Sequence, residues 1–130
     1  MVPKQCRIDP IEGGIRVVPQ GKQPFLGTAQ VKRTGPITLH LRARGVGGAG
    51  GEGRIQWRTQ GQEEFPKSGQ NIVFDLPAGT DWQEVTVEVP VEGRSDLVRL
   101  HLPGGKALEV QSIRWEAESE KAVGWDFSED

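Results

Sequence analysis

A strict alternation of apolar and polar residues between Pro36 and Arg44 constrains this chain more than any other feature. The apolar residues at every second position are Ile37, Leu39, Leu41 and Ala43. Side chains point to opposite faces along a β-strand, so these four share one face and Thr38, His40, Arg42 and Arg44 share the other. The pattern predicts a strand with one face in a core and one face open to solvent.

A second segment, residues 54–60, repeats this pattern after a glycine-rich connection. Its apolar phase contains Ile55, Trp57 and Thr59, and its polar phase contains Arg54, Gln56, Arg58 and Gln60. Both segments therefore carry a face rich in guanidinium and amide groups. If a surface of this protein binds a ligand, we expect it to be this polar face.

Shorter alternating segments predict further strands at residues 15–18, 25–31, 71–76, 84–90, 97–102 and 108–116. Within residues 25–31, we assign Phe25, Ala29 and Val31 to one phase. Within residues 108–116 the apolar phase slips, which predicts a β-bulge near Gln111 and Ser112. Most of the 18 glycines and 9 prolines fall outside these segments, and no stretch has the periodicity of a long helix. About eight short antiparallel strands predict an all-β fold, a two-sheet β-sandwich of the jelly-roll type.

The length of 130 residues suits one domain with one hydrophobic core. Residues 1–13 lack periodicity and are predicted to be a lead-in. Residues 117–130 form an acidic tail that contains Trp125 and Phe127. We expect these two aromatics either to dock back onto the domain or to contact a neighbouring domain.

Composition argues against nucleic acid and membrane partners and against an internal disulfide. A net charge of −2 and a pI of about 5.7 give no overall attraction for nucleic acid. No apolar run is long enough to span a membrane, and no apolar segment typical of a secretion signal follows the first residues. The single cysteine, Cys6, cannot form an internal disulfide and is expected to be an unreactive thiol.

No constellation of residues predicts catalysis. The only histidines are His40 and His101, and no metal-binding spacing or nucleophile motif accompanies them. Enzyme activity would require these two histidines to converge beside a carboxylate. A structural calcium ion could be held by Asp9, Glu12 or Asp126 together with backbone carbonyls.

A binding face is better supported than a catalytic site. The forked donors of Arg42, Arg44, Arg58 and Arg99 suit carboxylates, sulfates and hydroxyls, and His40, Gln56 and His101 would add hydrogen bonds. The alternative is that these residues only form the solvated side of a sheet, paired with Glu84 or Glu88 across strands. Trp57 and Trp115 fall in apolar phases and are predicted core residues. Trp82 would either cap one end of the sandwich or stand in a binding loop.

Several segments, taken together, resemble the galactose-binding-like jelly-roll modules that are attached to bacterial carbohydrate-active enzymes. These segments are residues 13–17, 21–26, 39–44, 56–59, 81–85, 98–100 and 109–114. More narrowly, the chain is similar to the C-terminal accessory domain of bacterial arylsulfatase-type sulfatases, whose chains end near a sequence such as Trp125-Asp126-Phe127. The resemblance extends from about Gly13 to Phe127.

This resemblance implies a non-catalytic, carbohydrate-binding-like module. The sulfatase signature, a Cys or Ser followed by x-Pro-x-Arg, is absent, because Cys6-Arg7-Ile8-Asp9-Pro10 does not match it. A catalytic domain would then lie elsewhere in a larger periplasmic or secreted protein, and the ligand would be a polysaccharide or oligosaccharide, with a sulfated glycan as one option. Alternatively, the module packs on its catalytic partner without binding sugar, and this predicts an exposed apolar patch around Trp82, Trp125 or Phe127.

Overall fold

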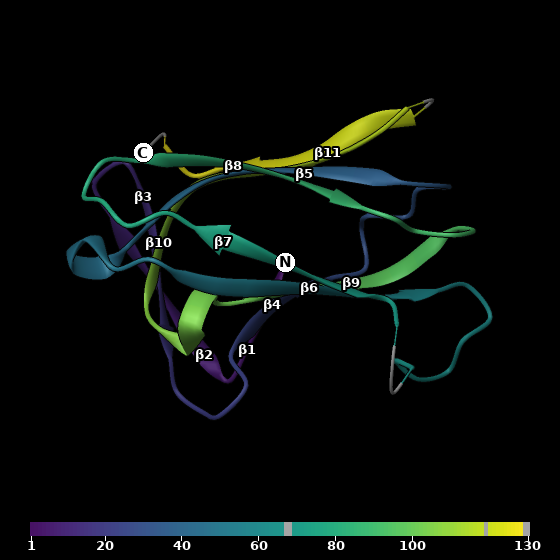
Figure 1. Ribbon diagram of the computed structural model, residues 1–130, viewed down its shortest axis with the longest axis horizontal. Coiled ribbons are helices and arrows are strands. Elements are labelled where there is room, and N and C mark those ends of the chain that lie inside the picture. The colour runs from purple at the N-terminus through teal and green to yellow at the C-terminus, as the bar shows by residue number, and fades with distance from the viewer. Residues whose placement is uncertain (67–68, 119, 129–130) are drawn as a thin grey trace.

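The chain folds into two antiparallel β-sheets that pack face to face. The computed structural model describes residues 1–66, 69–118 and 120–128. Within these ranges there is no α-helix, and two short 3-10 turns, Val46–Gly48 and Pro103–Gly105, accompany the strands. Figure 1 shows the two layers, with β5 and β11 in the upper one and β6 and β9 in the lower one. The predicted antiparallel β-sandwich of the jelly-roll type is confirmed.

Each sheet combines strands that are far apart in the sequence. The five-stranded sheet has the order β1 (Val2–Lys4), β4 (Phe25–Thr28), β9 (Ser95–His101), β6 (Gly51–Thr59) and β7 (Asn71–Leu76). The six-stranded sheet has the order β2 (Cys6–Ile11), β3 (Gly14–Pro19), β10 (Leu108–Ala117), β5 (Ile37–Gly45) and β8 (Gln83–Val89), and β11 (Glu120–Asp126) also pairs with β10.

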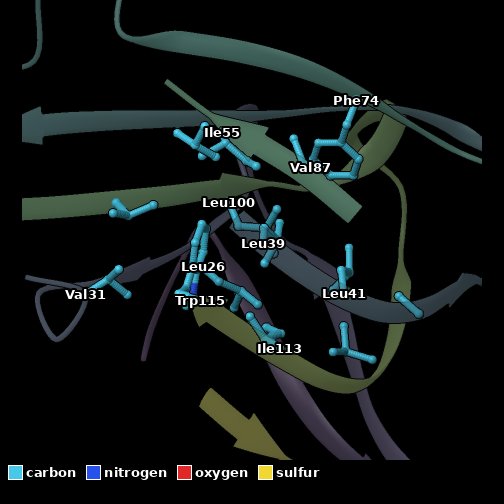
Figure 2. Packing of buried hydrophobic residues seen from close by; sticks show 14 of the residues in the cluster. Leu26, Val31, Leu39, Leu41, Ile55, Phe74, Val87, Leu100, Ile113 and Trp115 are labelled. Carbon is cyan, nitrogen blue, oxygen red and sulfur yellow. The ribbon is translucent and has the colours of Figure 1, made fainter. Parts of the chain in front are cut away.

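The core lies between the sheets and is built by the predicted alternation. Figure 2 shows the side chains of the six-stranded sheet, among them Leu39, Leu41, Ile113 and Trp115, facing Leu26, Ile55 and Leu100 of the other sheet. Trp57 and Trp115 are only 3% and 2% exposed, which confirms that they are core residues. The indole Nε1 atoms of both are buried without a hydrogen-bond partner in the described part of the chain.

Strand β10 is the centre of the six-stranded sheet. Along its whole length it pairs with β5, and the register shifts between Val110 and Ser112, so the predicted bulge at Gln111 is confirmed. On its other side, β10 first pairs with β3 through residues 108–110 and then with β11 through residues 112–117. The acidic tail therefore docks back onto the domain: its strand β11 pairs with the part of β10 that lies beyond the N-terminal end of β3.

The prediction that residues 1–13 are a lead-in is wrong, because they form β1 and β2. Both strands lie at sheet edges and contain a proline, Pro3 and Pro10. An edge strand tolerates proline because one of its sides forms no ladder of hydrogen bonds. These prolines and the charged residues around them obscure the alternation on which the sequence prediction depended.

The phase assigned to residues 25–31 is also partly wrong. Leu26 and Thr28 point into the core at 2% and 6% exposure, whereas Phe25 lies on the outer side of the sheet. The strand ends at Thr28, so that Val31, which is fully buried, follows a break in the pattern rather than a continuous strand.

Candidate functional site

The two strands that were expected to share one polar surface belong to different sheets. β5 lies in the six-stranded sheet and β6 in the five-stranded sheet. Because the apolar faces of both strands point into the same core, their polar faces point in opposite directions. The predicted binding residues are therefore divided between the two outer faces. His40, Arg42 and Arg44 lie on one face, and Gln56, Arg58, Arg99 and His101 lie on the other.

The two histidines are separated by the same division. His40 is on β5 and His101 is on β9, so the core lies between their side chains. The convergence of His40 and His101 that an independent enzyme would require is not present.

The outer face of the six-stranded sheet contains a groove of about 460 Å³, which we call the outer groove. It crosses β8, β5, β10 and β11, and its lining includes His40, Arg42, Glu84, Thr86, Ser112, Arg114, Trp125 and Asp126. The groove exists because β11 widens the sheet past the point where β3 leaves β10. This volume is in the range of small-molecule sites.

Hydrogen bonds hold the polar side chains of the outer groove in place. The guanidinium of Arg42 donates from Nε to Gln111 Oε1 and from Nη1 to Glu84 Oε1, the latter at 2.7 Å. The Arg42–Glu84 bond is a cross-strand pair of the kind that the alternative sequence interpretation anticipated. The positive charge of Arg42 in the groove is thus balanced by the negative charge of Glu84 on the neighbouring strand β8.

Two further basic groups of the outer groove share one carboxylate. His40 Nε2 lies 3.4 Å from Glu116 Oε1, and Arg114 Nη1 donates to Glu116 Oε2 at 3.3 Å. All three side chains remain partly exposed. They can therefore offer hydrogen bonds to a ligand without leaving a buried charge unpaired.

Arg44 and Trp82 lie outside this groove and form a packed corner. Arg44 Nε donates to Glu109 Oε1 at 2.8 Å, and its guanidinium Cζ lies 4.1 Å from the centroid of the Trp82 ring. A side chain at Gly14 would contact the same indole. Trp82 is half-buried between these neighbours, which favours its role as a cap of the sandwich.

Glu109 is the charged residue at the centre of this corner. It is only 7% exposed and accepts hydrogen bonds from both Arg44 and Arg16, the latter at 2.7 Å. Burial alone would raise the pKa of Glu109, but the hydrogen bonds from the two guanidinium groups outweigh it and hold this pKa below its ordinary value.

The outer face of the five-stranded sheet holds a different cluster, in which arginines contact aromatic rings. Arg58 donates to Asp96 Oδ2 through Nε and Nη2, at 3.2 and 2.6 Å. Arg99 Cζ lies 4.6 Å from the ring centroid of Phe25 and 3.9 Å from that of Phe65. Sequence reasoning missed both rings as site residues, because Phe25 was assigned with buried residues and Phe65 lies in a loop without periodicity.

His101 lies beside this cluster and is held neutral. Its ring centroid is 5.3 Å from that of Phe25, and its Nε2 is 3.3 Å from Gln56 Oε1. Burial and the positive charges of Arg54 and Arg99 lower the pKa of His101 from 6.5 to about 4. Burial and the two guanidinium charges thus both disfavour the protonated form of His101.

The described residues contain no group of three or more His, Cys, Asp or Glu side chains that could hold a metal ion. Asp9 pairs with Arg7 and Asp126 accepts hydrogen bonds from Ser128. The calcium ion considered at Asp9, Glu12 or Asp126 stays a prediction. In the same part of the chain, no helix has the length and apolar character needed to cross a membrane.

No known protein family and no curated protein matches this sequence. Solved structures with the same fold were found. A family 29 carbohydrate-binding module from Piromyces equi has a TM-score of 0.60 at 10% identity, over 83% of this chain and 72% of that chain. A carbohydrate-binding module of Cellvibrio mixtus lichenase 5A, solved in complex with cellotriose, has a TM-score of 0.57 at 15% identity, over 90% of each chain.

A third similar structure is the C-terminal family 6 module of the laminarinase LamC from Zobellia galactanivorans. It has a TM-score of 0.54 at 14% identity, over 90% of this chain and 92% of that chain. At these identities the likeness concerns the fold. The chain thus has the β-sandwich architecture found in carbohydrate-binding modules.

Proposed function

We propose that this domain is a non-catalytic carbohydrate-binding module whose ligand lies in the outer groove. The observation that carries the proposal is the groove itself, which places hydrogen-bonding side chains along the outer face of β5 and β10. The fold supports the choice of ligand class, since similar structures are carbohydrate-binding modules and one of them holds cellotriose.

The chemistry of the groove suits sugar hydroxyls. A hydroxyl both donates and accepts hydrogen bonds, and the groove offers guanidinium and imidazole groups next to carboxylates. The bonds from Arg42 to Gln111 and Glu84 fix the guanidinium before a ligand arrives. Such preorganisation reduces the entropy that binding costs.

The charges of the outer groove favour a neutral oligosaccharide over a sulfated one. Arg42 faces Glu84, and Glu116 lies between His40 and Arg114. A sulfate group would have to compete with these carboxylates. Binding of a neutral sugar would also depend little on salt, because salt mainly screens interactions between charges.

The proposal extends to the parent protein, which we infer to be an exported polysaccharide-degrading enzyme. The segments that resemble sulfatase accessory domains support a sulfatase as the catalytic partner. The alternative of a purely structural domain anticipated an exposed apolar patch around Trp82, Trp125 or Phe127. All three are half-buried, and the large apolar side chains that are exposed in the described chain are Val2, Val46 and Val73.

Affinity electrophoresis in gels that contain soluble β-glucans or mannans tests the proposal. We expect the wild-type chain to be retarded, and Arg42→Ala to weaken binding by about tenfold or more, because a hydrogen bond to a charged donor contributes about 1.5–3 kcal/mol. Arg7→Ala is the matched control, since Arg7 is also an exposed arginine paired with a carboxylate but lies outside the groove.

Two results would contradict the proposal. The first is a wild-type chain that no neutral polysaccharide retards. The second is equal retardation of the Arg42→Ala and Arg7→Ala variants, because the groove would then make no contribution that an unrelated surface arginine does not make.

A further inference from the structure

Arg99, on the face opposite to the outer groove, is a partly buried cation without a counter-ion. Its guanidinium has no ion pair or hydrogen bond with any residue of the ranges that the structure describes, and it lies against the rings of Phe25 and Phe65. Apart from Arg54, every other arginine in these ranges pairs with an aspartate or glutamate. Burial of a charge is costly unless the charge is compensated.

The surroundings of Arg99 add positive charge instead of neutralising it. Arg54 and Gln56 lie on the neighbouring strand β6, opposite His101 and Arg99 in the ladder. The charge of Arg58 and, above all, burial lower the pKa of Arg99. The acidic residue of the arginine cluster, Asp96, pairs with Arg58 and Lys32 and not with Arg99. A negatively charged group of a ligand would therefore neutralise the positive charge of Arg99.

An apolar hollow of about 290 Å³ adjoins Arg99. Val2, Phe25, Gly27 and Leu97 contribute to its lining, and Lys4 lies at the same hollow. The hollow is open because Gly27, opposite Arg99 in the ladder, has no side chain. A Cβ at this position would lie 3.4 Å from the ring of Phe25, which is ordinary van der Waals contact.

We propose that Arg99 and this hollow form a second binding site, which takes an acidic sugar unit. The apolar C–H face of a pyranose would pack on Phe25 and in the hollow, as sugar rings stack on aromatic rings. Its carboxylate or sulfate would accept hydrogen bonds from the guanidinium of Arg99, whose fork matches two oxygens of such a group. The inference depends on the proposed function for the ligand class, and it concerns a different site.

With this second site, the two faces of the domain would bind two different types of sugar. The outer groove has balanced charges and suits neutral sugars, whereas the Arg99 site has an excess of positive charge. A glycan with both neutral and acidic units would find a matching surface on each face of the sandwich.

The experiment compares polygalacturonate, a sulfated galactan and a neutral galactan by affinity electrophoresis and calorimetry with the full chain. We expect one or both acidic polymers to bind, and the comparison identifies carboxylate or sulfate as the group recognised. Arg99→Gln should weaken this binding by at least about tenfold, which corresponds to about 1.4 kcal/mol. Gly27→Ala, whose Cβ would lie beside the Phe25 ring at 3.4 Å, narrows the hollow without removing the charge of Arg99 and should weaken it as well.

Two controls separate this site from general electrostatics and from the outer groove. Arg54→Gln removes one positive charge from the same face. Because the Arg54 side chain does not contact Phe25 or Phe65, this variant should retain most of the binding. Arg42→Ala should weaken binding of neutral polymers, and it should weaken binding of acidic polymers much less than Arg99→Gln does. Equal losses in Arg99→Gln and Arg54→Gln would overturn the inference, as would a wild-type chain that binds neither acidic polymer.

Mapping on the isotope-labelled wild-type chain covers the case in which a variant does not fold. Oligomers of an acidic polymer that binds should shift the NMR signals of β4 and β9, and shifts confined to β5 and β10 would overturn the inference. If neutral polymers fail to bind while acidic ones bind through Arg99, the groove proposal falls and this inference stands.

Discussion

The neutral state of His101 makes the stability of the fold depend on pH in a defined window. The pKa of this imidazole is about 4 in the folded chain, because of burial and the charges of Arg54 and Arg99, and about 6.5 when it is exposed to water. Between these two values the unfolded chain binds a proton that the folded chain does not bind. Acidification therefore favours unfolding, and the stability that is fully present above pH 6.5 is lost as the pH falls towards 4.

The size of this effect follows from the same numbers. Each pKa unit is worth about 1.4 kcal/mol, so full shielding from water would give about 3 kcal/mol. The ring is only partly buried and water screens its charge, and we therefore expect about half of that value. Most of the loss should occur above pH 5, before exposed carboxylates, with pKa values of about 4, begin to titrate.

Urea denaturation of the wild-type chain and of His101→Gln at pH 7 and pH 5 measures the effect. The glutamine keeps a hydrogen-bonding group near Gln56 but cannot take up a proton, so the variant should lose little stability between these pH values, whereas the wild type should lose about 1 kcal/mol. Equal losses in both proteins would refute the reasoning, as would an NMR titration of the His101 ring with a midpoint near 6.5.

Two further predictions concern the carboxylate of Glu109 and the packing around Gly53. Glu109→Gln should lower the free energy of unfolding by about 1–2 kcal/mol in urea at neutral pH, because Arg16 and Arg44 lose their shared carboxylate while remaining partly exposed to water; an unchanged midpoint would show that these pairs contribute no net stability. Gly53→Ala should destabilise the fold by about 1–3 kcal/mol, because the added Cβ would lie 2.4 Å from the buried ring of Phe74; a crystal structure of the variant with Phe74 unmoved would contradict this explanation.

Local pattern predicted the strands in which every second residue is apolar. β5, β7 and β8 were found within about one residue of their bounds, because each has a face that must be buried. The bulge in β10 was equally predictable, because a phase slip in a strand that stays buried requires one additional residue. Short edge strands such as β1 and β2 have little to bury and no continuous ladder to keep, so their residues show no alternation.

The division of strands between the sheets could not be predicted in this way. Alternation shows which side of a strand is buried but not which strands are neighbours, and β5 and β6 have the same pattern in different sheets. For this reason the predicted binding residues were individually placed on outer faces but were wrongly placed together. The contact of Phe65 with Arg99 depends on a loop that returns over the sheet, and no periodicity indicates such a contact.

The central position of β10 has a consequence for how this protein is made. β3 and β5 both need β10 as a partner, but six strands lie between β3 and β10 in the chain and four lie between β5 and β10. Until then, both strands on a ribosome-bound chain have unsatisfied edges that another nascent copy could capture. We expect such a chain to close its sheets slowly, in about milliseconds to seconds, and to benefit from chaperones that shield β5 during synthesis.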